Sequence, residues 1–129
     1  MGATIFIILF VPSLYLATLL RSWGFELAAE RAMPLVEAIQ RYESTNGIPP
    51  SNLSALIPNY ISELPSQLPP LELVTGKDAE RNFYGNSWAL VADVGTGVLN
   101  WDRFIYLPKH NYPEHEAFQR IRDWGDYHE

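Results

Sequence analysis

The sequence predicts an α+β protein: an N-terminal transmembrane helix leads into a long amphipathic helix that packs on a small antiparallel sheet, and a short C-terminal helix follows. Three observations carry this prediction. Residues 3–20 contain no charged side chain. Apolar side chains recur at helical spacing between residues 22 and 46, and two later segments alternate with the period of a strand. We therefore divide the chain into an anchor, residues 1–21, and one α+β domain, residues 22–129.

The first predicted element is a membrane-spanning helix over residues 3–20, which Arg21 terminates. At about 1.5 Å per residue this helix would be ~27 Å long, close to the ~30 Å hydrocarbon core of a bilayer. A secretory signal has a positively charged start and a shorter apolar segment, whereas this chain starts with Met1-Gly2. We therefore favour an uncleaved anchor over a cleaved signal or a buried helix.

Composition narrows the function classes. The net charge of -6 belongs to the residues after the apolar segment, because that segment carries no charge. An acidic domain repels phosphate backbones, so we expect no nucleic-acid partner. The chain has no cysteine, which excludes disulfides, thiolate metal sites and thiol catalysis.

The second predicted element is an amphipathic helix over residues 22–46. Its apolar positions recur at spacings of three and four residues and form one stripe, namely Ala28, Ala32, Leu35, Ile39 and Tyr42. Gly47 is expected to end the helix. Gly24 is expected to break it from the anchor, and Pro34 to bend it, because proline removes one helical hydrogen bond.

Shorter elements are expected next. Ser51-Asn52 can cap a short helix over residues 53–57, which Pro58 closes. Residues 65–82 contain three prolines and a glycine and are interpreted as a loop, apart from a short edge strand over residues 71–74.

Two better strands and a last helix complete the prediction. Residues 87–93 and 101–107 can each be divided into two alternating sets of side chains, as in a strand, and lie on either side of the glycine-containing turn at 95–97. They are expected to form an antiparallel hairpin. Pro113-Glu114 is typical of a helix start. The apolar side chains that follow at three-residue spacing, Phe118, Ile121 and Trp124, predict a C-terminal helix.

Residues 32–50 and 53–65 together resemble the globular head of type IV pilin-like proteins, most closely the major pseudopilins of type II secretion systems. The resemblance rests on Ala32-Met-Pro-Leu-Val-Glu-Ala-Ile-Gln-Arg-Tyr42, then Asn46-Gly47-Ile-Pro-Pro50, Leu53-Ser-Ala-Leu56 and Leu64-Pro65. In that family a long helix ends in this way, a short helix and a Leu-Pro turn follow, and an antiparallel sheet packs on the long helix. The resemblance therefore implies the same order of elements here.

Two departures from the family bear on assembly. Pilins carry a Gly-Phe-Thr-Leu-x-Glu-like leader before the apolar segment, whereas Gly24-Phe25-Glu26-Leu27 follows it here. Pilins also carry an acidic residue inside the apolar segment, and residues 3–20 have none. Assembly into a filament is therefore not expected.

Topology is contested within the sequence. Arg21, Arg31 and Arg41 follow the predicted span, and by the positive-inside rule they place the domain in the cytoplasm. Heads of the pilin-like family are usually periplasmic. We give the family resemblance more weight and expect a single-pass protein of the bacterial inner membrane with a periplasmic domain.

Aromatic residues form the first candidate site. Five of them gather in the predicted hairpin and just before it: Tyr84, Trp88, Trp101, Phe104 and Tyr106. They could line a groove for a peptide or a sugar. Aromatic side chains that alternate on a hairpin are more often the core beneath a helix.

Metal-capable side chains cluster near the C-terminus: His110, Glu114, His115, Glu116 and, further on, His128. Their spacing matches no zinc signature, so we interpret the segment as a solvated turn.

Asp93 and Asp102, with Asn100, flank the predicted hairpin turn. The pseudopilin resemblance implies calcium in this part of the chain, but calcium needs six to eight oxygen ligands and two aspartates do not supply them. We expect no metal and no cofactor, and instead a cross-strand ion pair between Arg103 and one of the two aspartates.

No Gly-x-Ser-x-Gly elbow and no glycine-rich phosphate loop occurs in the chain, so we expect no enzyme. The leading hypothesis is a membrane-anchored, non-catalytic interaction or scaffold protein of a secretion or envelope assembly. Its partners would be the lipid bilayer and a protein of the membrane or envelope. The alternative is a membrane-tethered sensor domain that binds a small ligand or peptide in an aromatic pocket.

Overall fold

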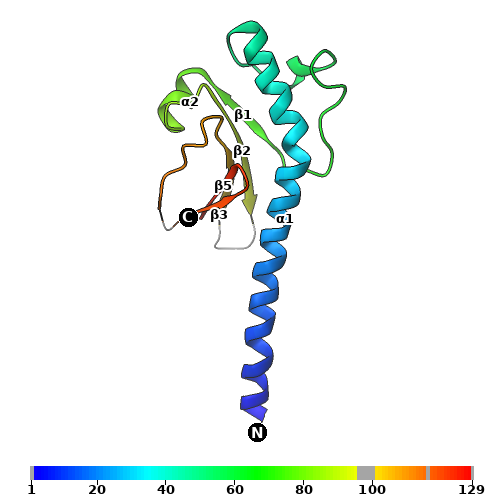
Figure 1. The fold of residues 1–129 in the computed structure, drawn as a ribbon. Helices are drawn as coiled ribbons and strands as arrows, with labels where there is room; N and C mark the ends of the chain where they lie inside the picture. Colours follow the sequence, from blue (N-terminus) through cyan, green and yellow to red (C-terminus); the bar gives the residue numbers. More distant parts are fainter. Residues whose placement is uncertain (1, 96–100, 116, 129) are drawn as a thin grey trace.

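The computed structural model describes residues 2–95, 101–115 and 117–128, and the side chains of residues 24–93, 103–115 and 117–127. The elements follow one another as α1 (Gly2–Asn46), the 3-10 helix η1 (Leu53–Leu56), β1 (Glu72–Thr75), α2 (Gly76–Asn82), β2 (Trp88–Gly95), β3 (Trp101–Tyr106), β4 (Phe118–Ile121) and β5 (Trp124–His128) (Figure 1).

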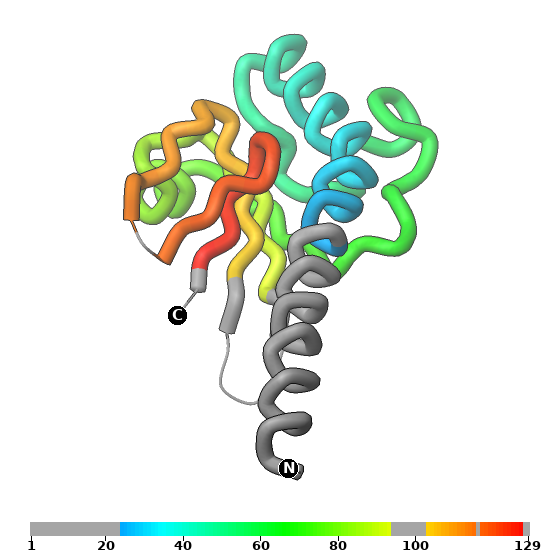
Figure 2. Tube along the Cα trace, turned by 60° about the horizontal axis from the view of Figure 1, so that its bottom comes forward, coloured from blue at the N-terminus to red at the C-terminus, as the bar shows by residue number. Residues whose placement is uncertain are grey.

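The strands form one antiparallel sheet in the order β1-β2-β3-β5-β4, so β1 and β4 are its edges. The helix α1 lies along one face of this sheet, as the two views in Figures 1 and 2 agree. We call the face toward α1 the inner face and the opposite one the outer face. Because successive side chains of a strand point to opposite faces, each strand contributes to both.

Side chains of α1 and of the inner face make up the main core. The buried members are Phe25, Ala29, Ala32, Leu35, Val36, Ala38, Ile39, Leu56, Trp88, Leu90, Ala92, Phe104, Tyr106, Ile121 and Trp124. Phe104 is stacked between two rings, with centroid distances of 5.1 Å to Phe25 and 4.4 Å to Trp124. These contacts join α1 to the strands β3 and β5 through one hydrophobic core.

Several local predictions are confirmed. Ala32, Leu35 and Ile39 of the α1 stripe are buried. Gly47 takes a φ of +80° and its backbone N–H donates to the Glu43 carbonyl at 2.8 Å, which ends the helix. The side chain of Asn52 caps the short helix η1 by accepting from the N–H of Ala55.

The helix α1 is unbroken at Gly24, contrary to the prediction. Pro34 also lies within the continuous helix. The predicted hairpin is present: β2 pairs with β3, with Val91 opposite Ile105.

The predicted C-terminal helix is wrong, and with it the predicted fold class. Residues 118–128 form the strands β4 and β5, which pair through a two-residue loop so that Ile121 lies opposite Trp124. Arg122, the first loop residue, has a φ of +55°, as such tight hairpin loops require. The sheet is therefore larger than predicted, with five strands.

The helix α2 lies in the segment that the sequence predicts to be a loop, so that prediction is wrong for residues 76–82. It is seven residues long, and Ala79 is its buried residue. Thr75 stands at the N-cap, and Asp78 in the first turn lies where a carboxylate favours the helix N-terminus. Gly76 is therefore the first residue of a helix.

The predicted transmembrane anchor is also wrong by the structural finding. Among the residues that the structure describes, no helix combines the length and the apolar character needed to cross a bilayer. In the part of α1 whose side chains are described, charged residues such as Glu26, Glu30 and Arg31 recur within single turns. The same finding contradicts the predicted location in the bacterial inner membrane with a periplasmic domain. Residues 1–23, which include the predicted span, lie outside the described side chains.

Candidate functional site

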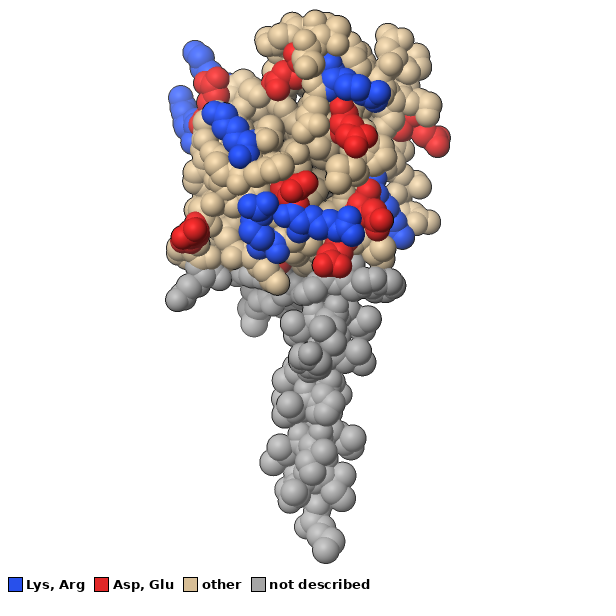
Figure 3. All heavy atoms as spheres, viewed as in Figure 1, with Lys and Arg blue, Asp and Glu red and all other residues tan. Residues whose placement is uncertain are grey.

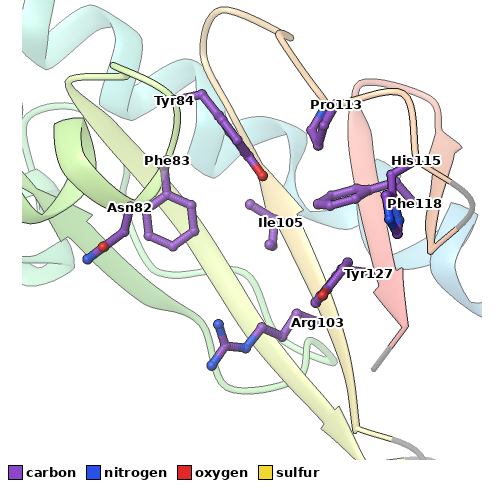
Figure 4. A pocket seen from close by; sticks show the side chains of 9 residues that line it. All are labelled: Asn82, Phe83, Tyr84, Arg103, Ile105, Pro113, His115, Phe118 and Tyr127. Carbon is purple, nitrogen blue, oxygen red and sulfur yellow. The ribbon is translucent and has the colours of Figure 1, made fainter.

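The outer face of the sheet carries a pocket of about 340 Å³, which we call the outer-face pocket. Figure 4 shows its side chains converging from the end of α2, from β3, β4 and β5, and from the segment before β4. The lining residues are Asn82, Phe83, Tyr84, Arg103, Ile105, Pro113, His115, Phe118 and Tyr127. Four of them are aromatic.

The strands supply the floor of the pocket. Strand alternation places Arg103 and Ile105 of β3 on the outer face, whereas Phe104 between them is buried on the inner face. Phe118 of β4 lies opposite Tyr127 of β5, and their ring centroids are 4.8 Å apart. This cross-strand aromatic pair forms the side of the pocket nearest the sheet edge.

The end of α2 supplies the upper wall. The N–H of Phe83 donates to the Ala79 carbonyl at 2.8 Å, and the N–H of Gly85 donates to the Glu80 carbonyl at 3.0 Å. The bond from Gly85 spans six residues around a left-handed residue and is the 6→1 bond of a Schellman motif, whose left-handed residue is usually glycine. Here that residue is Tyr84, with a φ of +54° and a side chain that is half-exposed.

Buried Asn86 fixes this wall to the segment after β3. Its amide nitrogen donates to the Phe83 carbonyl at 2.7 Å and to Oδ1 of Asn111 at 2.8 Å, and its Oδ1 accepts from the N–H of Lys109 at 2.9 Å. Asn111 in turn donates to the Tyr84 carbonyl at 2.9 Å. The backbone at Phe83 and Tyr84 is thus fixed by hydrogen bonds from the side chains of Asn86 and Asn111, and this positions the ring of Tyr84.

Tyr112 fixes the other wall, which includes Pro113. Its hydroxyl accepts from the N–H of Leu107 at 2.8 Å and donates to the Asp123 carbonyl at 2.5 Å. Burial raises the pKa of the Tyr112 hydroxyl, because the charged form would lose its solvation. The ring lies so close to Gly125 that a Cβ there would come within 2.7 Å of it. The absence of a side chain at Gly125 lets the segment pack against the sheet.

Charges at the pocket are few. Among the described lining residues, Arg103 and His115 are the ones that carry or can take up a positive charge, and no carboxylate is present. His115 Nδ1 accepts from the N–H of Ala117 at 3.1 Å, so the proton of the neutral ring lies on Nε2. On the face of the domain seen in Figure 3, acidic and basic side chains are interspersed. This visible face therefore shows no large patch of a single charge sign.

Arg103 makes the cross-strand ion pair predicted from the sequence. Its Nε lies 3.5 Å from Oδ1 of Asp93, the residue directly opposite in the β2–β3 register. The two side chains are 51% and 76% exposed, so solvent screens the pair and its contribution to stability is at most about 1 kcal/mol.

The five aromatic residues of the predicted groove do not line one surface. Trp88, Phe104 and Tyr106 lie in the core beneath α1. Tyr84 alone is brought to the outer-face pocket, and the side chain of Trp101 lies outside the described ones. Sequence reasoning missed the other three aromatic lining residues. The sequence carries no clear strand signal for Phe118, because the apolar residues of β4 stand three positions apart and do not alternate with polar ones.

The metal-capable side chains near the C-terminus, which the sequence predicts to lie in a solvated turn, are also divided. His110 Nε2 lies 3.2 Å from the Tyr106 hydroxyl, and its Nδ1 lies 3.9 Å from Oδ1 of Asp123. His115 lines the pocket instead. Within the described residues no group of three or more His, Cys, Asp or Glu side chains could hold a metal ion. Among the other metal-capable residues, Glu114 lines a neighbouring pocket together with His115. The side chains of the rest lie outside the described ones, namely Glu116, His128, Asn100 and Asp102.

Comparisons with known proteins give no further guidance to this site. No family model, no curated protein and no solved structure matches the chain. The resemblance to pilin-like heads therefore stays a prediction, and the function is argued from the pocket itself.

Proposed function

We propose that this protein is a non-catalytic binding module, and that the outer-face pocket receives an apolar or aromatic side chain of a partner polypeptide. The observation that carries the proposal is the conformation of Tyr84. A non-glycine residue in the left-handed region costs roughly 1–2 kcal/mol, and a large aromatic residue is rare there. A glycine at the same position would remove that cost, as the glycine usual in this motif does.

The rest of the pocket suits the same role. Phe83 and Phe118 stand on opposite sides of it, and Ile105 lies between them (Figure 4). Its volume of about 340 Å³ is at the small end of the range for ligand pockets, which suits one side chain. The hydrogen bonds of Asn86 preorganise the upper wall, which lowers the entropy lost on binding.

The lining also explains why we propose binding and not catalysis. The nine described lining residues include no serine, cysteine or carboxylate, and His115 Nδ1 already accepts from the N–H of Ala117, so the described lining presents no Ser–His or Cys–His pair. Tyr84 and Tyr127 can contribute hydroxyl hydrogen bonds to a ligand.

The test is Tyr84→Gly in the full chain. The substitution should raise the free energy of unfolding by about 1 kcal/mol, because glycine adopts a positive φ without strain. It should also weaken binding of N-acetyl-L-phenylalaninamide at least tenfold, measured by NMR titration of the pocket tyrosines and phenylalanines. Improved stability together with lost binding distinguishes a functional residue from a structural one.

Ile48→Ala serves as the control, because Ile48 is 66% exposed and does not line the pocket. Ile48→Ala should leave the free energy of unfolding and the affinity for N-acetyl-L-phenylalaninamide unchanged within error. Unaltered affinity in Tyr84→Gly, or failure of the probe to shift Phe83, Phe118 or Tyr127 resonances in the unmodified chain, would refute the proposal.

A second candidate function is recognition of a small ligand such as a sugar, which the aromatic walls and the pocket volume also favour. Titration with methyl glycosides under the same conditions decides between the two. Saturable shifts with a glycoside and none with the amide would favour the small ligand.

A further inference from the structure

We infer that the outer-face pocket recognises the C-terminal residue of its partner: a large apolar side chain inserts between Phe83 and Phe118, and its α-carboxylate binds Arg103. This inference rests on the proposed function and adds the chemistry of the bound group.

The first support is the charge of the pocket. The chain as a whole has a net charge of -6, yet the described lining contains Arg103 and His115 and no acid. Such a lining favours an anionic ligand group over a cationic one, because the guanidinium of Arg103 can donate hydrogen bonds to an anion and no lining carboxylate can bind a cation. A partner group that combines apolar surface with one negative charge therefore complements the pocket best.

The second support is the position of Arg103. Its guanidinium lies at the end of the pocket away from Tyr84 and Pro113 (Figure 4). The apolar part of the pocket and the charged end are thus separated along one direction. A ligand that fills the pocket must therefore carry an apolar side chain at one end and a negatively charged group a short distance away at the other.

The third support is that the Arg103–Asp93 pair is weak enough to be exchanged. The contact involves Nε at 3.5 Å, and both side chains are at least half-exposed. A guanidinium has five N–H donors and binds a carboxylate best through two of them. A ligand carboxylate that forms such a two-point contact can replace or join Asp93 at little cost in stability.

Size favours a terminal residue over an internal acid. At a chain end the side chain and the carboxylate leave the same Cα, so both fit in a pocket of about 340 Å³. An internal Asp or Glu beside an aromatic residue would bring two further stretches of backbone into the same space. Tyr84 and Pro113 stand at the far side of the pocket, where such a chain would have to continue.

The experiment compares three probes on the full chain by NMR titration: N-acetyl-L-phenylalanine, its amide, and the internal mimic N-acetyl-aspartyl-phenylalaninamide. The free acid should bind about tenfold tighter than the amide, and tighter than the internal mimic. Arg103→Met should remove the advantage of the acid and leave binding of the amide within twofold. Asp93→Asn should strengthen binding of the acid two- to threefold, because it frees the guanidinium.

Arg81→Met is the matched control, since Arg81 is an exposed residue of α2 outside the lining and the charge change is the same. It should preserve the preference for the acid. Equal binding of acid and amide would overturn this inference and leave the proposed function standing, whereas no binding of either would overturn both. An internal mimic that binds as tightly as the acid would reject a terminal carboxylate.

Discussion

The two faces of the sheet use aromatic residues in opposite ways. On the inner face Trp88 and Phe104 are fully buried against α1, and their rings stack on neighbouring rings. On the outer face Phe118 and Tyr127 are partly exposed and border a pocket. The strands β4 and β5 also contribute Ile121 and Trp124 to the inner core, because residues one apart in a strand point to opposite faces. Aromatic content alone therefore does not locate a binding surface. The face on which a ring lies and how far it is covered decide its role.

Truncating one ring on each face tests this comparison most strongly. Phe104→Ala should lower the free energy of unfolding by roughly 3–5 kcal/mol, because the ring is buried between Phe25 and Trp124. Phe118→Ala should cost less than about 1.5 kcal/mol, because its ring remains partly in water. Urea unfolding of both variants gives the two values. Equal costs would mean that the outer face belongs to the core as much as the inner one does.

A substitution at Gly125 tests how closely the outer face is packed beneath Tyr112. Gly125→Ala should cost about 1–3 kcal/mol, because the new Cβ would lie 2.7 Å from Cδ1 of Tyr112. Thermal unfolding measures the effect. The double variant Gly125→Ala, Tyr112→Ala should show less than the sum of the two single costs, since the clash disappears with the ring. Additive costs would indicate that the strand, and not the ring contact, needs glycine.

The smallest expected effect concerns the Tyr112 hydroxyl. Tyr112→Phe should cost about 1–2 kcal/mol at neutral pH, because the N–H of Leu107 loses its acceptor. Burial raises the pKa of Tyr112 above its usual value of 10.0, so its contribution is fully present below pH 10 and is lost as the pH rises above it. The difference in the free energy of unfolding between the unmodified chain and Tyr112→Phe should therefore become smaller as the pH rises from 8 to 11. A cost that stays constant with pH would argue against a buried neutral hydroxyl.

The sequence allowed those elements to be predicted whose periodicity spans many residues. The α1 stripe that includes Leu35 and Ile39 repeats over several turns, and the strands β2 and β3 alternate around a glycine-containing turn. Each repeat adds an independent constraint, so one misplaced residue does not change the interpretation.

The C-terminal prediction failed because its signal was three residues long. Phe118, Ile121 and Trp124 have helical spacing, but Ile121 and Trp124 are brought together by a tight turn between two strands. The turn contains Arg122 at a positive φ, where glycine or asparagine would have signalled a hairpin. Tertiary pairing with β3 outweighs the local preference of this segment.

The pocket was beyond sequence reasoning for a related reason. Its lining comes from segments that lie far apart in the sequence, and the pairing of β5 with β3 brings Tyr127 beside Arg103. Of the lining residues, Tyr84 is the one that the sequence places in the candidate aromatic groove, whereas His115 and Arg103 were singled out for other roles. The positive φ of Tyr84 leaves no trace in the local sequence except the neighbouring Gly85. Strand order and long-range pairing had to be known before the site could be recognised.

Asn86 has a consequence for how the domain opens. Loop segments usually fluctuate independently of the sheet, and their amide protons exchange readily with solvent. Here one buried amide connects the end of α2 to Lys109 and Asn111, two residues of the segment after β3. Neither segment can swing outward alone without leaving polar atoms of Asn86 unsatisfied in a buried site. We therefore expect the two walls to open together as one cooperative unit, with amide protons on both that exchange at similar rates.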